Sequence, residues 1–177
     1  MEAPRWGALT IGITGGNRLD RDATFLFNAA AGRPDDRFAF AVPEGPLGDV
    51  IPRPAVGEYT LITCKKRHEL IGQAGTTDAL ACRYRSEAGA DIDLELIAKS
   101  GLETAVSMYD HNVARWQEQG YLTFDWGDTV NDSGAVIGGY HQMRRGEVEI
   151  WWQRIENMLL YIAGATTEVA RFIDAAN

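Results

Sequence analysis

The chain has 177 residues, 45% of them hydrophobic, so it can bury a core without a metal ion or a disulfide to hold it together. A formal charge of −8 argues against a nucleic-acid binder, which needs basic surfaces to neutralise phosphates, and it favours a basic protein partner. No segment approaches the roughly 18 apolar residues of a membrane span, and the N-terminus lacks the pattern of a secretory signal, so we expect a cytoplasmic protein without membrane contact.

The chain shows no internal repeat, low-complexity tract or long polar linker, so residues 1–177 are expected to form a single globular domain. Strands are expected at 8–14 and 37–42, whereas 20–32 fits a short helix and a strand equally well. Residues 43–56 hold four of the six prolines. Because proline removes a backbone donor, this segment is expected to be an irregular crossing that is held to the body by the apolar side chains of Leu47, Val50 and Ile51.

A strand is expected at 59–65, and the alternating pattern of 80–96 predicts a hairpin. On its first strand apolar residues alternate with Arg83 and Arg85, and on its second they alternate with acidic residues, among them Asp91 and Asp93. One face should therefore enter the core while the other sets arginines opposite carboxylates. We interpret the charged face as a solvated, salt-bridged surface and not as a catalytic carboxylate pair.

Two cysteines, Cys64 and Cys82, lie in separate strand-like segments. In a reducing cytoplasm, two buried free thiols are the favoured interpretation. A disulfide stays open as an alternative, because 59–65 and 80–85 could be neighbouring strands.

The clearest helix is expected at 100–119. Ser100 and Glu103 have the spacing of a capping box, and Gly120 stands where a left-handed C-terminal cap is needed. An apolar stripe recurs at three- and four-residue steps along it. Its members are Leu102, Val106, Tyr109, Val113 and Trp116.

Four strands and a closing helix are expected after this helix. The strands are placed at 121–124, 135–143, 147–155 and 158–163, and the helix at 166–175 with Val169, Phe172 and Ile173 on its inner side. The loop 125–134 gathers Asp125, Asp128, Asn131 and Asp132. Their spacing does not match a calcium loop, so we interpret them as turn-forming residues.

The segment 147–163 is apolar on both faces if Glu156 and Asn157 form a two-residue turn in which the asparagine takes the left-handed backbone. Trp151 then pairs with Ile162, while the adjacent Trp152 points to the opposite face. A sheet that is apolar on both sides must be covered on both sides. The predicted fold is therefore α+β, with a central antiparallel sheet covered by helices on both faces as an α/β/α sandwich.

This order of elements resembles the PsbP-like superfamily, including its bacterial DcrB-like branch. The segments that carry the resemblance are SGLETAVSMYDHNVARWQEQGYLTF, GAVIGGYHQMRR and EIWWQRIENMLLYIAGATTEVARFIDAA, all in the C-terminal half. The resemblance implies an antiparallel sheet between helices. It also implies a non-enzymatic role as an adaptor, chaperone or assembly factor, and it supplies no catalytic residues.

One constellation is a candidate binding surface. Trp151 is flanked on its own face by Glu149 and Gln153, and His141 or Tyr140 on the preceding strand adjoins them, depending on register. An aromatic plate beside hydrogen-bonding groups suits a ligand pocket or a protein hot spot. The same residues also fit plain packing under a helix.

These observations favour a non-catalytic protein-binding module, such as an adaptor, a chaperone or an immunity-type inhibitor, that uses a partly covered aromatic sheet face. The alternative is a small-molecule binding protein or cofactor-free enzyme with a cavity between sheet and helix, where His141, Glu149 and Tyr161 would be the polar groups. A structural subunit of a larger assembly is a third possibility. No cofactor is expected, and the three histidines lack the spacing of a metal site.

Overall fold

The computed structural model describes residues 12–14, 27–29, 47, 50–131 and 133–176. The strand expected at 37–42, and most of the residues in 8–14, 20–32 and 43–49, lie outside this part of the chain. The described helices and strands are β1 (Gly12–Thr14), β2 (Phe27–Ala29), β3 (Val50–Pro52), β4 (Ala55–Val56), β5 (Tyr59–Lys66), two short 3-10 helices (His68–Leu70 and Gln73–Gly75), β6 (Thr76–Ser86), β7 (Asp91–Lys99), α1 (Leu102–Glu118), β8 (Leu122–Val130), β9 (Val136–Arg145), β10 (Val148–Ile155), β11 (Met158–Ala165) and α2 (Thr166–Ala176).

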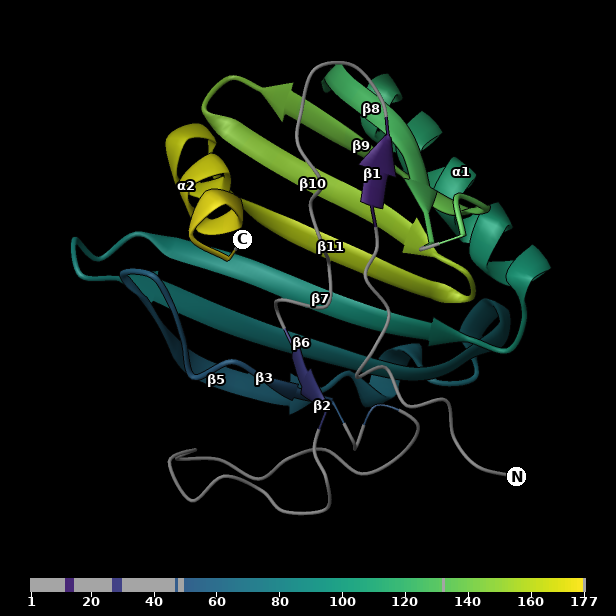
Figure 1. The fold of residues 1–177 in the computed structure, drawn as a ribbon, viewed down its shortest axis with the longest axis horizontal. Helices are drawn as coiled ribbons and strands as arrows, with labels where there is room; N and C mark the ends of the chain where they lie inside the picture. Colours follow the sequence, from purple (N-terminus) through teal and green to yellow (C-terminus); the bar gives the residue numbers. More distant parts are fainter. Residues whose placement is uncertain (1–11, 15–26, 30–46, 48–49, 132, 177) are drawn as a thin grey trace.

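Nine of the described strands form one antiparallel sheet in the order β1-β8-β9-β10-β11-β7-β6-β5-β4, and β2 pairs with β3 separately. The strands β8 and β9 lie toward one end of the sheet and β5 toward the other (Figure 1). The ribbon formed by β10 and β11 is in the middle. Most of its side chains are buried on both faces, which is why its sequence reads as a nearly continuous apolar stretch.

The register expected for this ribbon is confirmed. Trp151 pairs with Ile162, and the pairing runs to Ile155 opposite Met158 at the turn. The left-handed residue of the turn is Glu156, with φ 51°, and not Asn157 as the sequence indicated. Asn157 instead donates a hydrogen bond from Nδ2 to the carbonyl of Lys99, at 2.8 Å, which ties the turn to the end of β7.

Two apolar clusters lie on opposite faces of the sheet. On the Trp152 face, the side chain of Trp152 packs with Tyr109 and other residues of α1. On the Trp151 face, a larger cluster includes the inner side of α2, where Val169, Phe172 and Ile173 are all buried as expected.

The predicted α/β/α sandwich is wrong. The described chain is dominated by its sheet, and its two helices leave much of that sheet without helical cover. Nine strands at about 4.8 Å spacing span roughly 40 Å, whereas one helix is about 10 Å wide and covers two or three strands. Where β6 and β7 carry Arg83 and Asp93, the Trp152 face has charged side chains in place of a helix, and both residues are half exposed.

The hairpin of β6 and β7 shows the predicted charge pairing. Arg83 binds Asp93 through two hydrogen bonds of 2.6 and 3.1 Å, and Arg85 binds Asp91 through two of 2.7 and 3.1 Å. Each arginine lies directly across the strand pair from its carboxylate. These ion pairs are solvated, which fits a surface role.

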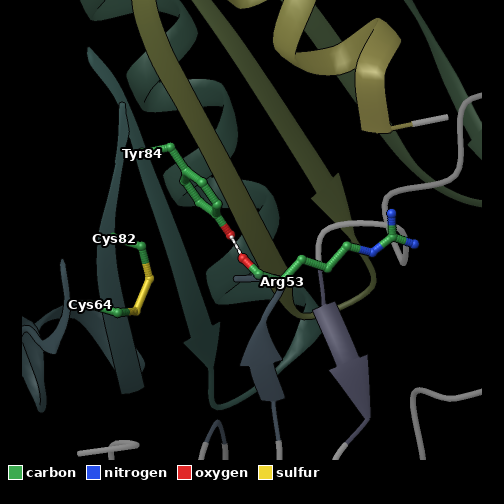
Figure 2. Close-up of a disulfide and its surroundings, with 4 residues drawn as sticks. All are labelled: Arg53, Cys64, Cys82 and Tyr84. Carbon is green, nitrogen blue, oxygen red and sulfur yellow. Dashed lines mark hydrogen bonds between the residues drawn. A yellow bond between two sulfur atoms is a disulfide. The ribbon is translucent and has the colours of Figure 1, made fainter. Parts of the chain in front are cut away.

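The interpretation of Cys64 and Cys82 as free thiols is wrong, because the two residues form a disulfide (Figure 2). They stand directly opposite each other on β5 and β6, with their Cα atoms 4.0 Å apart. Near this bridge, the Tyr84 hydroxyl donates a hydrogen bond of 2.9 Å to the carbonyl of Arg53 (Figure 2). Together the two links join β6 to β5 and to the segment that precedes β4.

The predicted helix is confirmed as α1, and Gly120 has the expected left-handed backbone with φ 87°. The predicted capping box is absent from its start. Gly101 is the N-cap, and no side chain caps the helix there. Ser100 therefore lies one residue too early for its hydroxyl to serve as the cap.

The expected loop at 125–134 is shorter than the sequence indicated, because β8 continues to Val130. Asp125 and Asp128 are therefore strand residues and not turn residues. Asn131 does form the turn: its side-chain oxygen accepts hydrogen bonds from the backbone amides of Ser133 and Ala135.

Candidate functional site

Four of the five residues proposed from the sequence share one face and are buried there. Trp151 and Tyr140 stack with ring centroids 4.6 Å apart and an interplanar angle of 10°. Glu149 and Gln153 lie beside them on the same strand, and all four side chains are at most 3% exposed. In this structure they form part of the interior.

The polar atoms of this buried group are largely satisfied within the chain. The Trp151 indole donates to Gln153 Oε1 at 3.3 Å, and Gln153 Nε2 donates to the Thr129 hydroxyl at 3.1 Å. Glu149 accepts hydrogen bonds from Gln142 Nε2 and from Arg144 Nη2. Such a network supports packing, because each buried donor or acceptor that it satisfies would otherwise destabilise the fold.

His141, the fifth proposed residue, lies on the opposite face. On β9 it stands opposite Trp152 of β10 and Trp126 of β8. Its Nδ1 forms a 2.7 Å hydrogen bond with the Tyr109 hydroxyl. Tyr161 shares the Trp152 face, but Glu149 does not. The three polar residues proposed for a cavity therefore do not converge on one space.

A different surface emerges on β8. In the part of the chain that the structure describes, seven large apolar side chains are strongly exposed, and three of them fall within five residues of this strand. They are Leu122 at 74%, Phe124 at 47% and Trp126 at 68%. We call these three side chains and the strand that carries them the β8 surface.

A β-bulge decides how the β8 surface is divided between the two faces. The register of β8 on β9 shifts between Thr123 and Asp125, so Phe124 is an extra residue. The Arg144 guanidinium lies 4.6 Å from the centre of the Phe124 ring, on the Trp151 face. Trp126 points to the other face, next to His141. Exposed apolar side chains thus flank the strand on both sides.

No described strand pairs with the outer edge of β8 along this stretch. Among the described residues, β1 pairs with β8 only at Asp128, Thr129 and Val130, and no strand pairs with the outer edge from 122 to 127. An unpaired edge presents backbone amides and carbonyls that another strand can bind.

The charge of this strand is purely acidic. β8 contains Asp125 and Asp128 and no lysine or arginine. Asp128 is exposed, and Asp125 is half-buried with Oδ1 accepting a 3.0 Å hydrogen bond from the Trp126 amide. Arg144, which stands opposite Leu122 on β9, forms an ion pair with Glu149 at 3.3 Å.

The sequence contained a signal for this surface that the loop interpretation concealed. In LTFDWG, large apolar side chains recur at every second residue from Leu122 to Trp126. This is the alternation of a strand. A strand that ends at Phe124 places Trp126 in a turn, whereas the observed strand continues to Val130 and carries Trp126.

His141 gives the rim of this surface a pH-dependent component. Burial lowers the pKa of His141 below its ordinary value of 6.5, and the nearby Asp110 opposes that shift. The folded chain therefore binds this proton more weakly than the unfolded chain does, and its stability falls as the pH drops from 6.5 toward the folded pKa.

We expect the unfolding free energy to fall more steeply between pH 7.5 and 5 in the wild type than in a His141→Gln variant. Glutamine keeps an acceptor for the Tyr109 hydroxyl but does not titrate. Urea unfolding across this pH range measures both curves, and parallel curves would show that His141 contributes nothing to the pH dependence.

Comparisons with known proteins do not place the chain in a family. No family model matches it, and no curated protein matches it. One solved structure is similar, the GTP binding regulator from Thermotoga maritima, at 14% identity and a TM-score of 0.40 over 67% of this chain and 75% of that one.

Three further features bear on the kind of site. Within the described residues, no helix is long and apolar enough to cross a bilayer, and no group of His, Cys, Asp or Glu is arranged to hold a metal ion. An open depression of about 470 Å³ lies between the start of α1 and the β10–β11 turn, bordered by Leu102, Val136 and Arg154. It contains none of the titratable residues proposed from the sequence.

Proposed function

We propose that the chain is a non-catalytic protein-binding module that docks a basic partner on the β8 surface. The observation that carries the proposal is the exposure of Leu122, Phe124 and Trp126 along a strand edge with which no other described strand pairs at 122–127. Large apolar side chains that gather at one exposed place, here on the two sides of one strand, are typical of interaction sites. The docking surface is thus displaced from Trp151 to the end of the sheet.

The apolar contribution of this surface is large enough to hold a partner. Covering the exposed two thirds of Trp126 would remove roughly 130 Å² of largely apolar surface from water, which contributes up to about 3 kcal/mol. Tryptophan is among the residues that most often dominate binding energy at interfaces. Phe124 and Leu122 add exposed apolar area on the opposite face of the same strand.

Electrostatics favour a basic partner. The chain carries 25 acidic and 17 basic residues, and the strand at the centre of the surface adds only carboxylates. Complementary charge accelerates association and disfavours acidic competitors. An adaptor, chaperone or inhibitor role fits these properties.

Site-specific photocrosslinking tests the proposal. With a photoreactive phenylalanine at position 126, we expect one protein adduct in cells that express the full chain at its natural level. The same group at 62 on β5 or at 102 at the start of α1, which are also exposed apolar positions but lie outside the β8 surface, should give no such adduct. Changing Leu122 and Phe124 to serine should reduce the adduct at 126 by about tenfold. Equal adducts at all three positions would contradict a docking role for β8.

A further inference from the structure

We infer that the partner binds by adding an extended, basic strand to the outer edge of β8 at residues 122–127. This inference rests on the proposed function and specifies its geometry. The occupant is a segment of another protein in which apolar residues alternate with lysine or arginine. Its backbone would extend the sheet beyond β8, next to β1.

The backbone supplies the first part of the argument. The six residues from 122 to 127 span about 20 Å at 3.4 Å per residue, which is the length of an ordinary strand. Among the described residues nothing pairs with their outer edge. Main-chain hydrogen bonds at such an edge give affinity for an extended peptide, and pockets for its alternate side chains give specificity.

The side chains supply the second part. Because of the bulge, Leu122 and Phe124 lie on one face of the sheet and Trp126 on the other. An added strand also points its side chains alternately to both faces. Its residues would therefore meet apolar contacts on each side, at the roughly 5 Å separation of cross-strand neighbours. A helix docked on one face would contact only one of the two sets.

Charge decides between a partner and a second copy of the chain. Pairing residues 122–127 of β8 with the same residues of another copy would bring the Asp125 carboxylates of the two strands close together, and like charges across a strand pair are destabilising. Carboxylates on an edge also protect a protein from self-association. Lysine or arginine on the incoming strand converts this repulsion into attraction.

The test uses the full chain and three synthetic hexapeptides with blocked ends. The probe alternates valine and lysine, one control alternates valine and glutamate, and the other keeps the lysines but replaces the central valine with proline. Hydrogen exchange of the backbone amides at 122–127 is measured with each peptide. We expect the valine–lysine peptide to slow exchange of the outward-facing amides by tenfold or more, and the two controls to leave it unchanged.

Two variants separate the charge from the apolar contacts. Asp125→Asn combined with Asp128→Asn should weaken binding of the valine–lysine peptide by about tenfold, while amide protection at saturation stays the same. Trp126→Ser should weaken binding by a similar factor. Leu102→Ser, at an exposed apolar position on α1, is the matched control and should leave the affinity unchanged.

The outcomes distinguish this inference from the proposed function. If the valine–lysine peptide binds and Trp126→Ser abolishes binding, but amide exchange at 122–127 does not change, strand addition is wrong while the docking surface stands. If 122–127 become protected without peptide as a dimer forms in sedimentation, the occupant is a second copy and the inference is overturned. If neither peptide nor crosslinked protein contacts β8, both proposals fail.

Discussion

Replacing Trp152 with alanine should lower the unfolding free energy by about 3–5 kcal/mol, the range found when large aromatic side chains are removed from cores. The indole is 1% exposed. It lies 6.0 Å from Tyr109 in a stacked arrangement and 5.4 Å from Trp116 edge to face. Its Nε1 also donates a 3.2 Å hydrogen bond to the Tyr109 carbonyl. Alanine therefore leaves a cavity and removes the main contact between α1 and the sheet.

Trp126→Ala is the matched control for this prediction. It removes the same side chain from the same face, but Trp126 is mostly exposed, so we expect a change below about 1 kcal/mol. Guanidinium unfolding followed by circular dichroism measures both variants on one scale. Similar losses for Trp152 and Trp126 would show that α1 is not anchored through Trp152.

Local patterns predicted those parts of the fold whose cause is local. Alternation fixed the register of the β10–β11 ribbon, and the salt-bridged hairpin followed from arginines and aspartates at matching positions. The apolar stripe from Leu102 to Trp116 predicted α1, and Gly120 predicted where it ends. In each case the side chains that decide the structure lie within about 20 residues of one another.

The parts that were not predicted depend on contacts between distant segments. An apolar strand must be covered, but its sequence does not say how far the cover extends, and the width of a nine-stranded sheet exceeds what two helices can cover. The faces of His141 and Tyr140 were left open because the register of β9 on β10 was unknown. The bulge at Phe124 places its ring and that of Trp126 on opposite faces of the sheet, and no glycine, proline or asparagine at this point of the sequence indicates a bulge.

The β8 surface shows why buried and exposed aromatic residues leave different signals in a sequence. The adjacent Trp151 and Trp152 are conspicuous in the sequence, yet both are buried and contribute to the core. Trp126 stands alone between two small or polar residues, with Asp125 before it and Gly127 after it. A large aromatic residue in a strand of alternating polarity is informative when it faces solvent, and exposure is a property of the whole fold.

Removing the disulfide by changing Cys64 and Cys82 to alanine should lower the unfolding free energy by about 3 kcal/mol under oxidising conditions. The bridge closes a loop with a sequence separation of 18, and a loop of that size restricts the unfolded chain by about this amount. Both side chains are buried between β5 and β6, so alanine adds only a small packing loss at each position. Urea unfolding with and without a thiol reductant measures the effect.

Reductant separates the bridge from the packing of the two side chains. In the presence of a reductant, the wild type should lose most of its advantage over the double variant, because both chains then unfold without a cross-link. The single variants Cys64→Ala and Cys82→Ala should resemble the double variant in either condition. A further check unfolds the wild type without reductant and then alkylates it. If two thiols per chain are labelled, the bridge is not formed. That result would restore the free thiols expected for a reducing cytoplasm, whereas an intact bridge is typical of an oxidising compartment.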